Sequence, residues 1–307
     1  MPKVAFVQTE QSFKVPENDP WGNEDSVFYR AMLPGKDYDN SAISCGNGAM
    51  YRKEALLSIG GFSAWNLVED VHTSMLLHSK GWVSVYHEVA YTQGTAPSDV
   101  VAQVKQRWQW AVDSLRMFFW DSPLFKKGLN LRQRLQYFHF GYHYVTFGLF
   151  LPIFFLLPIC ALFTHQFMLP EPLWRYVLAR LPYFLFYIIT NQILTQRLHS
   201  FKVFQAQAGL FGAYFDAFFT ALFSRRRIPQ YTVTRKIALR PGVFSRLYRC
   251  FPHIVFVLLS LGAIVYGAST IENDIWFLGI NVFWALWTVA VLSRFIVLSL
   301  WPRWFVR

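Results

Sequence analysis

The chain has 307 residues, of which 54% are apolar and 19% aromatic, and its mean hydropathy is +0.25. These values exclude an ordinary water-soluble domain, and the many charges near the start exclude a bundle of membrane helices alone. Fourteen of the eighteen acidic residues lie at or before Asp121. We therefore expect the first ~120 residues to be water-soluble and the rest to be associated with a membrane.

The net charge of +11 collects beside apolar segments. Eight basic residues and no acidic residue lie between Ser224 and Arg249, which is typical of a loop on the cytoplasmic side of a membrane. No soluble module presents a basic face, so nucleic acid is not an expected partner. The three cysteines, Cys45, Cys160 and Cys250, are too widely spaced to indicate a disulfide framework or a zinc site.

The water-soluble part predicts an α/β domain, of which this chain holds only a portion. In chain order we expect strands at 3–8, near 42–44 and at 83–87, and helices at 50–59 and 68–79. Residues 9–40 are expected to form loops and short helices. Gly60 and Gly61 should end the first of the two long helices, and Gly81 the second.

A longer helix is predicted over residues 103–119, where apolar residues recur every three or four positions. Gln106, Gln109 and Asp113 lie on the opposite face. Such a helix could lie along the membrane interface with its polar face toward the soluble domain. Its apolar stripe consists of Val104, Trp108, Ala111, Leu115 and Phe118.

Four membrane spans are expected after this helix, each near the length that a ~30 Å hydrocarbon core requires. They are residues 142–164, 173–195, 253–271 and 276–300. Residues 203–223 are also apolar but carry a small and polar stripe that includes Asp216, so we expect this segment to lie flat. The soluble domain and the basic loop then share the cytoplasmic side, and the turn near Asn273 lies outside.

Three short motifs could carry chemistry, and each also has a purely structural interpretation. Glu69 and Asp70 could be a catalytic acid pair or could simply interact favourably with a helix N-terminus. Gln106 and Trp110 face the same way and could bind a sugar, or Trp110 could anchor the helix at lipid headgroups. Residues 231–236 could bind phosphate or form a solvated basic loop.

The order of these motifs resembles that of the processive family 2 glycosyltransferases, among which bacterial cellulose synthases show the nearest pattern. The family's Thr-Glu-Asp, Q-x-x-R-W and F-x-V-T-x-K motifs correspond to Val68-Glu69-Asp70, Gln106-x-x-Gln109-Trp110 and Tyr231-x-Val233-Thr234-x-Lys236. The opening VAFVQTEQSF and the turn from Ser44 to Gly48 also resemble family sequences. The resemblance implies a partial GT-A-type domain over 1–121 and a membrane domain over 122–307, with about four transmembrane helices, interfacial helices and a gating loop at 228–240.

The resemblance also implies roles for individual residues in transferring a sugar, with inversion, from a nucleotide donor to a growing glucan. Asp70 matches the general base, Glu69 would support it electrostatically, and His72 would orient the pair. Trp110 would stack beneath the acceptor sugar, and Gln109 stands where the family has an arginine. The remaining expected site residues are Gln106 and Arg107 for donor or acceptor groups, Cys45 and Gly46 near the acceptor end, and Tyr231, Val233, Thr234 and Lys236 in the gating loop.

The family's uridine-binding Asp and metal-binding Asp-x-Asp are expected upstream of residue 1, so ligands for Mg²⁺ or Mn²⁺ are expected outside this chain. Asp37-Tyr38-Asp39 matches the Asp-x-Asp pattern but is interpreted as a solvated loop. His139 and His143 could ligate a metal or belong to an interfacial aromatic belt. The chain is therefore expected to be an incomplete fragment that makes no polymer alone.

The expected partners are a nucleotide sugar such as UDP-glucose, a glucan such as cellulose, the lipid of the inner (plasma) membrane and accessory synthase subunits. The glycosyltransferase domain would face the cytoplasm, and the polymer would pass through the membrane. Two alternatives stay open. The protein could be a non-catalytic membrane subunit or channel, or it could be a synthase for another polysaccharide, such as curdlan, hyaluronan or a chitin-like polymer.

Overall fold

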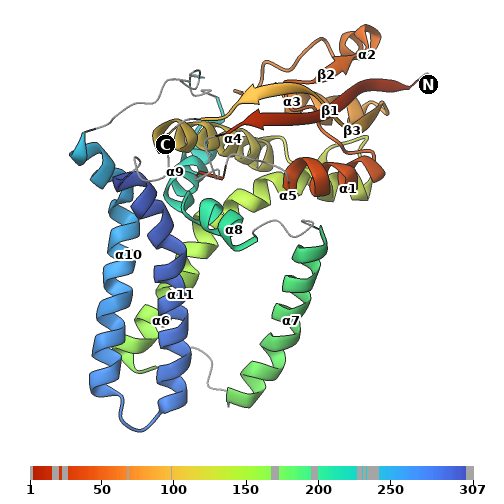
Figure 1. The fold of residues 1–307 in the computed structure, drawn as a ribbon. Coiled ribbons are helices and arrows are strands. Elements are labelled where there is room, and N and C mark those ends of the chain that lie inside the picture. The colour runs from red at the N-terminus through yellow and green to blue at the C-terminus, as the bar shows by residue number, and fades with distance from the viewer. Residues whose placement is uncertain are drawn as a thin grey trace. The chain divides into compact units, whose positions relative to one another are not determined.

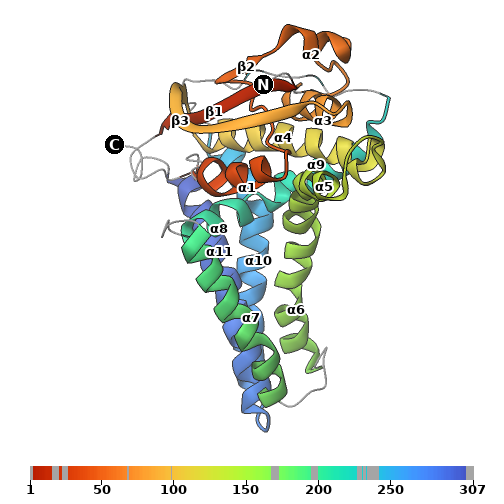
Figure 2. The same cartoon turned by 90° about the vertical axis from the view of Figure 1, so that its right-hand side faces the viewer.

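The computed structural model describes residues 3–15, 21–22, 27–67, 69–97, 99–166, 173–194, 200–226, 230, 233 and 242–301. It forms two compact units, shown in Figures 1 and 2. The first unit consists of Met1–Gly148 and Ala213–Leu239, and the second of Leu149–Gly212 and Arg240–Arg307. This division differs from the predicted boundary at residue 121, because the helix that follows residue 130 packs on the long helix before it: the rings of Phe118 and Phe138 stack at 4.8 Å.

A mixed sheet forms one layer of the first unit (Figure 1). In the described residues its strands are β1 (Val4–Lys14), β2 (Ala49–Tyr51) and β3 (Val83–Thr95), in the order β2-β1-β3. β1 is antiparallel to β2 and parallel to β3, with Phe6 opposite Tyr51 on one side and Ser84 on the other. β1 and β3 are longer than the sequence predicts. The mixed sheet confirms the predicted α/β class for this part of the chain.

The helices of the first unit follow the glycine signals closely. Helix α2 (Lys53–Ser58) ends before Gly60 and Gly61, which adopt φ values of +85° and +99°. Helix α3 (Asp70–Ser79) ends before Gly81, with a φ of +81°. Because L-residues rarely adopt positive φ, these glycines allow the chain to turn away from each helix. The other helices of this unit are α1 (Leu33–Tyr38), α4 (Val100–Trp120), α5 (Leu131–Val145) and α9 (Phe211–Phe223), with short helical turns at Phe28–Met32, Pro123–Phe125 and Thr146–Phe150.

The predicted strand near residues 42–44 is wrong. These residues are buried, but the backbone N–H of Ser44 donates to the side-chain oxygen of Ser74 at 2.9 Å instead of to a neighbouring strand. The segment therefore runs over α3 rather than joining the sheet. The added strand is β2, which begins five residues later.

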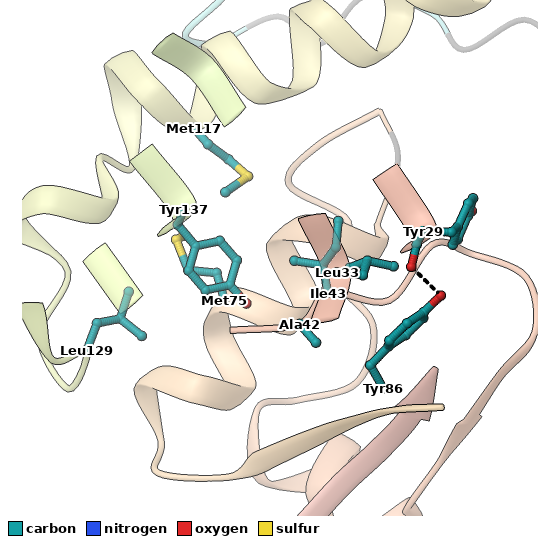
Figure 3. Close-up of a cluster of buried hydrophobic side chains, with 9 residues drawn as sticks. All are labelled: Tyr29, Leu33, Ala42, Ile43, Met75, Tyr86, Met117, Leu129 and Tyr137. Carbon is teal, nitrogen blue, oxygen red and sulfur yellow. Dashed lines mark hydrogen bonds between the residues drawn. The ribbon is translucent and has the colours of Figure 1, made fainter. Parts of the chain in front are cut away.

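The main core of the first unit connects the sheet to its helices (Figure 3). Met75 of α3, Met117 of α4 and Tyr137 of α5 contribute to one buried cluster. Tyr86 of β3 reaches the same cluster and donates its hydroxyl to the carbonyl of Tyr29 at 2.7 Å. The cluster also includes Leu33, Ala42, Ile43 and Leu129. The helix that begins at Asp70 is therefore fixed by packing on several sides.

The second unit is helical and apolar, which confirms the helical fold class predicted for the C-terminal part of the chain. In both views α10 (Val243–Thr270) and α11 (Ile275–Leu300) run side by side and α6 (Leu151–Thr164) packs beside them (Figures 1 and 2). Ile159 and Leu162 of α6 share a buried cluster with Ala263 of α10 and Ala285 of α11. The unit also contains α7 (Leu173–Leu194) and α8 (Ser200–Ala208).

Among the described residues, three helices are long and apolar enough to cross a membrane: Leu131–Thr164, Val243–Thr270 and Ile275–Leu300. They match three of the four predicted spans. The remaining predicted span, residues 173–195, coincides with the 22-residue helix α7. The apolar part of this helix is shorter and covers Val177–Thr190. Residues 203–223 do not form one continuous helix, because a turn at Gly209 and Leu210 separates α8 from α9.

Candidate functional site

The two acids of the first motif lie at the start of α3 but in different environments. Glu69 is exposed, whereas Asp70 is half-buried and its Oδ1 accepts the backbone N–H of Val71 at 2.7 Å. Burial, and to a smaller extent the neighbouring charge of Glu69, raises the pKa of Asp70 to about 7. A carboxyl group with a pKa near neutrality is suited to accept a proton from a hydroxyl group.

The turn from Ser44 to Gly48 lies directly against this carboxyl group. Gly46 adopts a φ of +70°, and a Cβ atom built on it would lie 3.3 Å from Oδ2 of Asp70. The structure therefore brings together Cys45, Gly46 and Asp70, which the sequence places in two separate motifs. A ligand atom near the Gly46 backbone would also be near the Asp70 carboxylate.

Gln8 on β1 holds this turn, and sequence reasoning did not identify it as a site residue. Its side chain is fully buried, its Oε1 accepts from the Cys45 N–H at 2.8 Å, and its Nε2 donates to the Asn47 carbonyl at 2.8 Å. The signal was present in the VAFVQT segment, because an amide buried in a strand requires polar partners. The partners lie about forty residues away and could not be named from the pattern.

Helix α4 carries the second motif and begins with a well-defined cap. Asp99 accepts the backbone N–H of Ala102 at 2.8 Å. Gln109 and Arg107 are buried, at 2% and 7% exposure, whereas Gln106 and Trp110 are half-buried. Of the four motif residues, Gln106 and Trp110 therefore keep the most surface for a ligand.

Arg107 lies beside Trp110, one helical turn away. Its guanidinium carbon is 4.7 Å from the centroid of the Trp110 ring, within the range of a cation–π interaction. Nη2 also donates to the Gly22 carbonyl at 3.5 Å. The positive charge missing at Gln109 is thus present within the same motif, next to the aromatic ring.

The loop before the acid pair is attached to α4. Oδ1 of Asp113 accepts the backbone N–H of Leu67 at 2.7 Å, and the Asp113 carbonyl accepts from the side-chain amide of Asn66 at 3.1 Å. The predicted polar face of this helix therefore does face the soluble unit. The two motifs belong to one structural unit, connected through Asp113.

The ring of His72, which was expected to orient the acid pair, hydrogen-bonds to Ser63 and Asp121. One ring nitrogen lies 2.5 Å from Oγ of Ser63 and the other 2.9 Å from Oδ2 of Asp121. Although burial acts to raise it, the hydrogen bonds from His72 and Lys126 lower the pKa of Asp121. His72 therefore joins α3 to the segment that follows α4.

The gating-loop motif falls mostly outside the described residues. Tyr231, Thr234 and Lys236 are not described, and neither are Val68 of the first motif and Arg303–Arg307. Val233 is described and is 75% exposed. The role assigned to this loop stays a prediction.

Within the described part of the chain, no group of three or more His, Cys, Asp or Glu side chains could hold a metal ion. The two acids of Asp37-Tyr38-Asp39 have structural roles instead of lying in a solvated loop. Oδ1 of Asp37 accepts the backbone N–H of Tyr86 at 2.7 Å, and Asp39 pairs with Arg132 at 3.3 Å. The ligands expected for Mg²⁺ or Mn²⁺ stay a prediction.

The first unit presents a half-buried carboxyl group beside a glycine turn, and helices long and apolar enough to cross a membrane follow it in the chain. The sequence profile described as "Glycosyl transferase family group 2" matches residues 1–191, and the chain belongs to this family.

Curated relatives agree with this assignment. The chain is 27% identical over 280 residues to the "Cellulose synthase catalytic subunit [UDP-forming]" of Komagataeibacter sucrofermentans, covering 86% of this chain and 36% of that protein. It is 26% identical over 316 residues to the protein of the same name from Pseudomonas fluorescens, covering 97% and 42%. "Cellulose synthase 1" of Komagataeibacter xylinus is 33% identical over 146 residues, covering 44% and 9%. The chain thus spans less than half the length of these relatives.

Proposed function

We propose that the protein acts in a membrane polysaccharide synthase that transfers glucose from UDP-glucose to a growing β-glucan such as cellulose. The observation that carries the proposal is the contact between the Gly46 turn and the Asp70 carboxylate, in a unit that also contains the Gln106–Trp110 motif. The names of the relatives, which are UDP-forming cellulose synthase subunits, support this donor and product.

The proposed reaction is an inverting displacement. The terminal hydroxyl oxygen of the acceptor attacks the anomeric carbon of the donor sugar and gives its proton to Asp70. The bond from that carbon to the diphosphate oxygen breaks on the opposite face, and UDP leaves. Because the pKa of Asp70 is raised to about 7, the rate should fall as the pH drops through 7 and this base becomes protonated.

The neighbouring residues would bind the two substrates. Trp110 would stack on the terminal acceptor sugar, and Gln106 would hydrogen-bond to its hydroxyl groups. Arg107, beside Trp110, would supply positive charge toward the departing diphosphate in place of the arginine that Gln109 replaces. Thr234 and Lys236 are proposed to reach the diphosphate from the gating loop, and Mg²⁺ or Mn²⁺ would neutralise its charge when bound.

The remaining assignments follow the same proposal. The first unit would face the cytoplasm, where nucleotide sugars are made, and the apolar helices would lie in the inner membrane and pass the polymer outward. Accessory synthase subunits would bind the complex on the far side. The basic residues between Ser224 and Arg249 support this orientation.

The test uses membranes from cells that express the gene carrying this sequence. These membranes should incorporate radiolabelled glucose from UDP-glucose into insoluble polymer, and cellulase should release the label. UDP-N-acetylglucosamine, supplied alone and together with UDP-glucuronate, tests the chitin-like and hyaluronan alternatives. Polymer formed only from one of these donors would contradict the proposed substrate, and no incorporation from any donor would contradict the proposed activity.

A further inference from the structure

The buried side-chain amide of Gln8 forms hydrogen bonds with backbone groups of the turn that contains Gly46. Its side chain is 0% exposed, and it spans the two ends of the Cys45–Asn47 segment. Oε1 accepts from the Cys45 N–H at 2.8 Å, while Nε2 donates to the carbonyls of Asn47 at 2.8 Å and Thr9 at 2.9 Å. One side chain thus satisfies backbone groups on both sides of Gly46.

The same turn is anchored from the opposite side by α3. The Ser44 N–H donates to Oγ of Ser74 at 2.9 Å, and that hydroxyl donates to the Asp70 carbonyl at 2.8 Å. Ser74 is fully buried, like Gln8. The turn is therefore held between β1 and the first turn of α3.

Gly46 lies between these anchors and contacts the catalytic candidate. A Cβ atom there would be 3.3 Å from Oδ2 of Asp70, so the backbone of Gly46 forms one wall around the carboxylate. Any movement of the turn changes both this wall and the amount of water around Asp70. Two hydrogen bonds thus connect Gln8 to the turn that lies beside the carboxylate.

We propose that Gln8 is a positioning residue, whose amide clamps the backbone of Cys45 and Asn47 and thereby holds the Gly46 turn against Asp70 on the acceptor side of the site. This inference rests on the proposed function for the role of Asp70, but the clamp itself does not. Gln8 touches neither substrate. It acts by fixing the distance between the turn, where the acceptor would lie, and the carboxylate that would take its proton.

Gln8→Met keeps the length of the side chain but removes both the donor and the acceptor. The turn should then move, and displacements of about 1 Å at a reacting group can lower turnover by ~100-fold. We expect kcat to fall by ~10- to 100-fold, with the KM for the nucleotide sugar within about 2-fold of wild type. The acidic limb of the pH–rate profile should shift to lower pH than in the wild type. A loosened turn admits water to Asp70, and this hydration lowers the pKa of its carboxyl group.

Two further variants make the test independent of folding defects. Gln11→Met is the matched control: Gln11 lies on the same strand, and its Oε1 accepts from the Tyr29 hydroxyl at 2.8 Å, away from the turn. Ser74→Ala loosens the same turn from the α3 side. We expect Ser74→Ala to change kcat and the pH profile in the same direction as Gln8→Met, and Gln11→Met to leave both unchanged.

Hydrogen exchange of the peptide that contains Cys45–Gly48, measured by mass spectrometry in the purified protein, tests the clamp without activity. Gln8→Met should speed exchange in this peptide at least ~10-fold, and Gln11→Met should not. Equal exchange in wild type and Gln8→Met overturns the clamp. Faster exchange with wild-type kcat and pH profile overturns the positioning role. If the wild-type protein transfers no sugar, the proposed function fails, whereas the exchange result still decides the clamp.

Discussion

The indole N–H of Trp108 donates a hydrogen bond to the carboxylate of Asp216 over 2.6 Å. The contact explains why an acidic residue occurs in the otherwise apolar helix α9, since its charge is directed at a polar partner on α4. Trp120 continues the same interface by donating to the Ala221 carbonyl at 2.9 Å. The long α4 helix is thus joined to the helix that precedes the proposed gating loop.

Trp108→Phe should therefore destabilise the first unit, because it keeps most of the aromatic surface but removes the donor. A hydrogen bond of this kind contributes about 1 kcal/mol, so we expect Tm to fall by roughly 2–4 °C in a thermal shift assay. Trp276→Phe, at an exposed position of α11, is the control. A larger fall for Trp276→Phe than for Trp108→Phe would contradict the structural role of this bond.

Membrane topology gives a second prediction. If α6, α7, α10 and α11 cross the membrane and α8 and α9 do not, positions 224 and 273 lie on opposite sides. Ser224→Cys and Asn273→Cys would each be introduced after Cys45, Cys160 and Cys250 are replaced by Ser. A membrane-impermeant thiol reagent applied to intact cells should label position 273 alone. Labelling of both positions, or of position 224 alone, would refute this arrangement.

The turn beside Asp70 allows a comparison between two glycines. Both Gly46 and Gly60 have positive φ, so alanine at either position should cost about 1–2 kcal/mol of backbone strain. A Cβ at Gly46 would be 3.3 Å from Oδ2 of Asp70, whereas nothing lies within 4 Å of one at Gly60. We therefore expect similar losses of Tm, but a fall in turnover of ~10-fold or more for Gly46→Ala only. Equal turnover in the two variants would show that the Gly46 turn does not affect the reaction.

These local features could be read from the sequence to different degrees. The helices that end at Gly60 and Gly81, the 103–119 helix and the apolar helices were predicted well, because periodicity and glycine stops act within a few residues. The strand expected at 42–44 was wrong, since a short buried segment does not reveal whether its hydrogen bonds go to a strand or to Ser74. The neighbours of Asp70 and the role of Gln8 depend on contacts over long chain separations, which no local pattern encodes.

A buried lysine predicts a pH dependence of stability. Lys36 is 2% exposed, and its Nζ donates to the Gln136 carbonyl at 2.7 Å and lies 4.2 Å from the Phe140 ring centroid. Burial lowers the pKa of Lys36 to about 7, opposed in part by the charge of Asp39. Between pH 7 and about 10, the unfolded chain holds a proton that the folded chain has lost, so the free energy of unfolding rises with pH in this window.

The comparison is between the wild-type protein and Lys36→Met, with Tm measured at pH 7 and pH 9. Between pH 7 and pH 9, the free energy of unfolding of the wild type should rise relative to that of the variant by up to about 2 kcal/mol. The difference in Tm should rise by roughly 4–8 °C. Lys127→Met removes an exposed ammonium group and serves as the control. Its difference in Tm from the wild type should change less between pH 7 and pH 9 than that of Lys36→Met. A wild-type advantage that shrinks as the pH rises would contradict a lysine buried in its neutral form.

The central claim is that Asp70 takes the proton of the acceptor hydroxyl, and the most direct measurement compares Asp70→Asn with Glu69→Gln. Both changes are nearly isosteric and remove one carboxylate from the same motif, but only Asp70 contacts the Gly46 turn. In membranes that form polymer with the wild-type protein, Asp70→Asn should lower glucose incorporation by ~10²- to 10⁴-fold while nucleotide binding is retained. Glu69→Gln should cause a smaller loss. Turnover of Asp70→Asn within about 10-fold of wild type, or a larger loss in Glu69→Gln, would contradict the account.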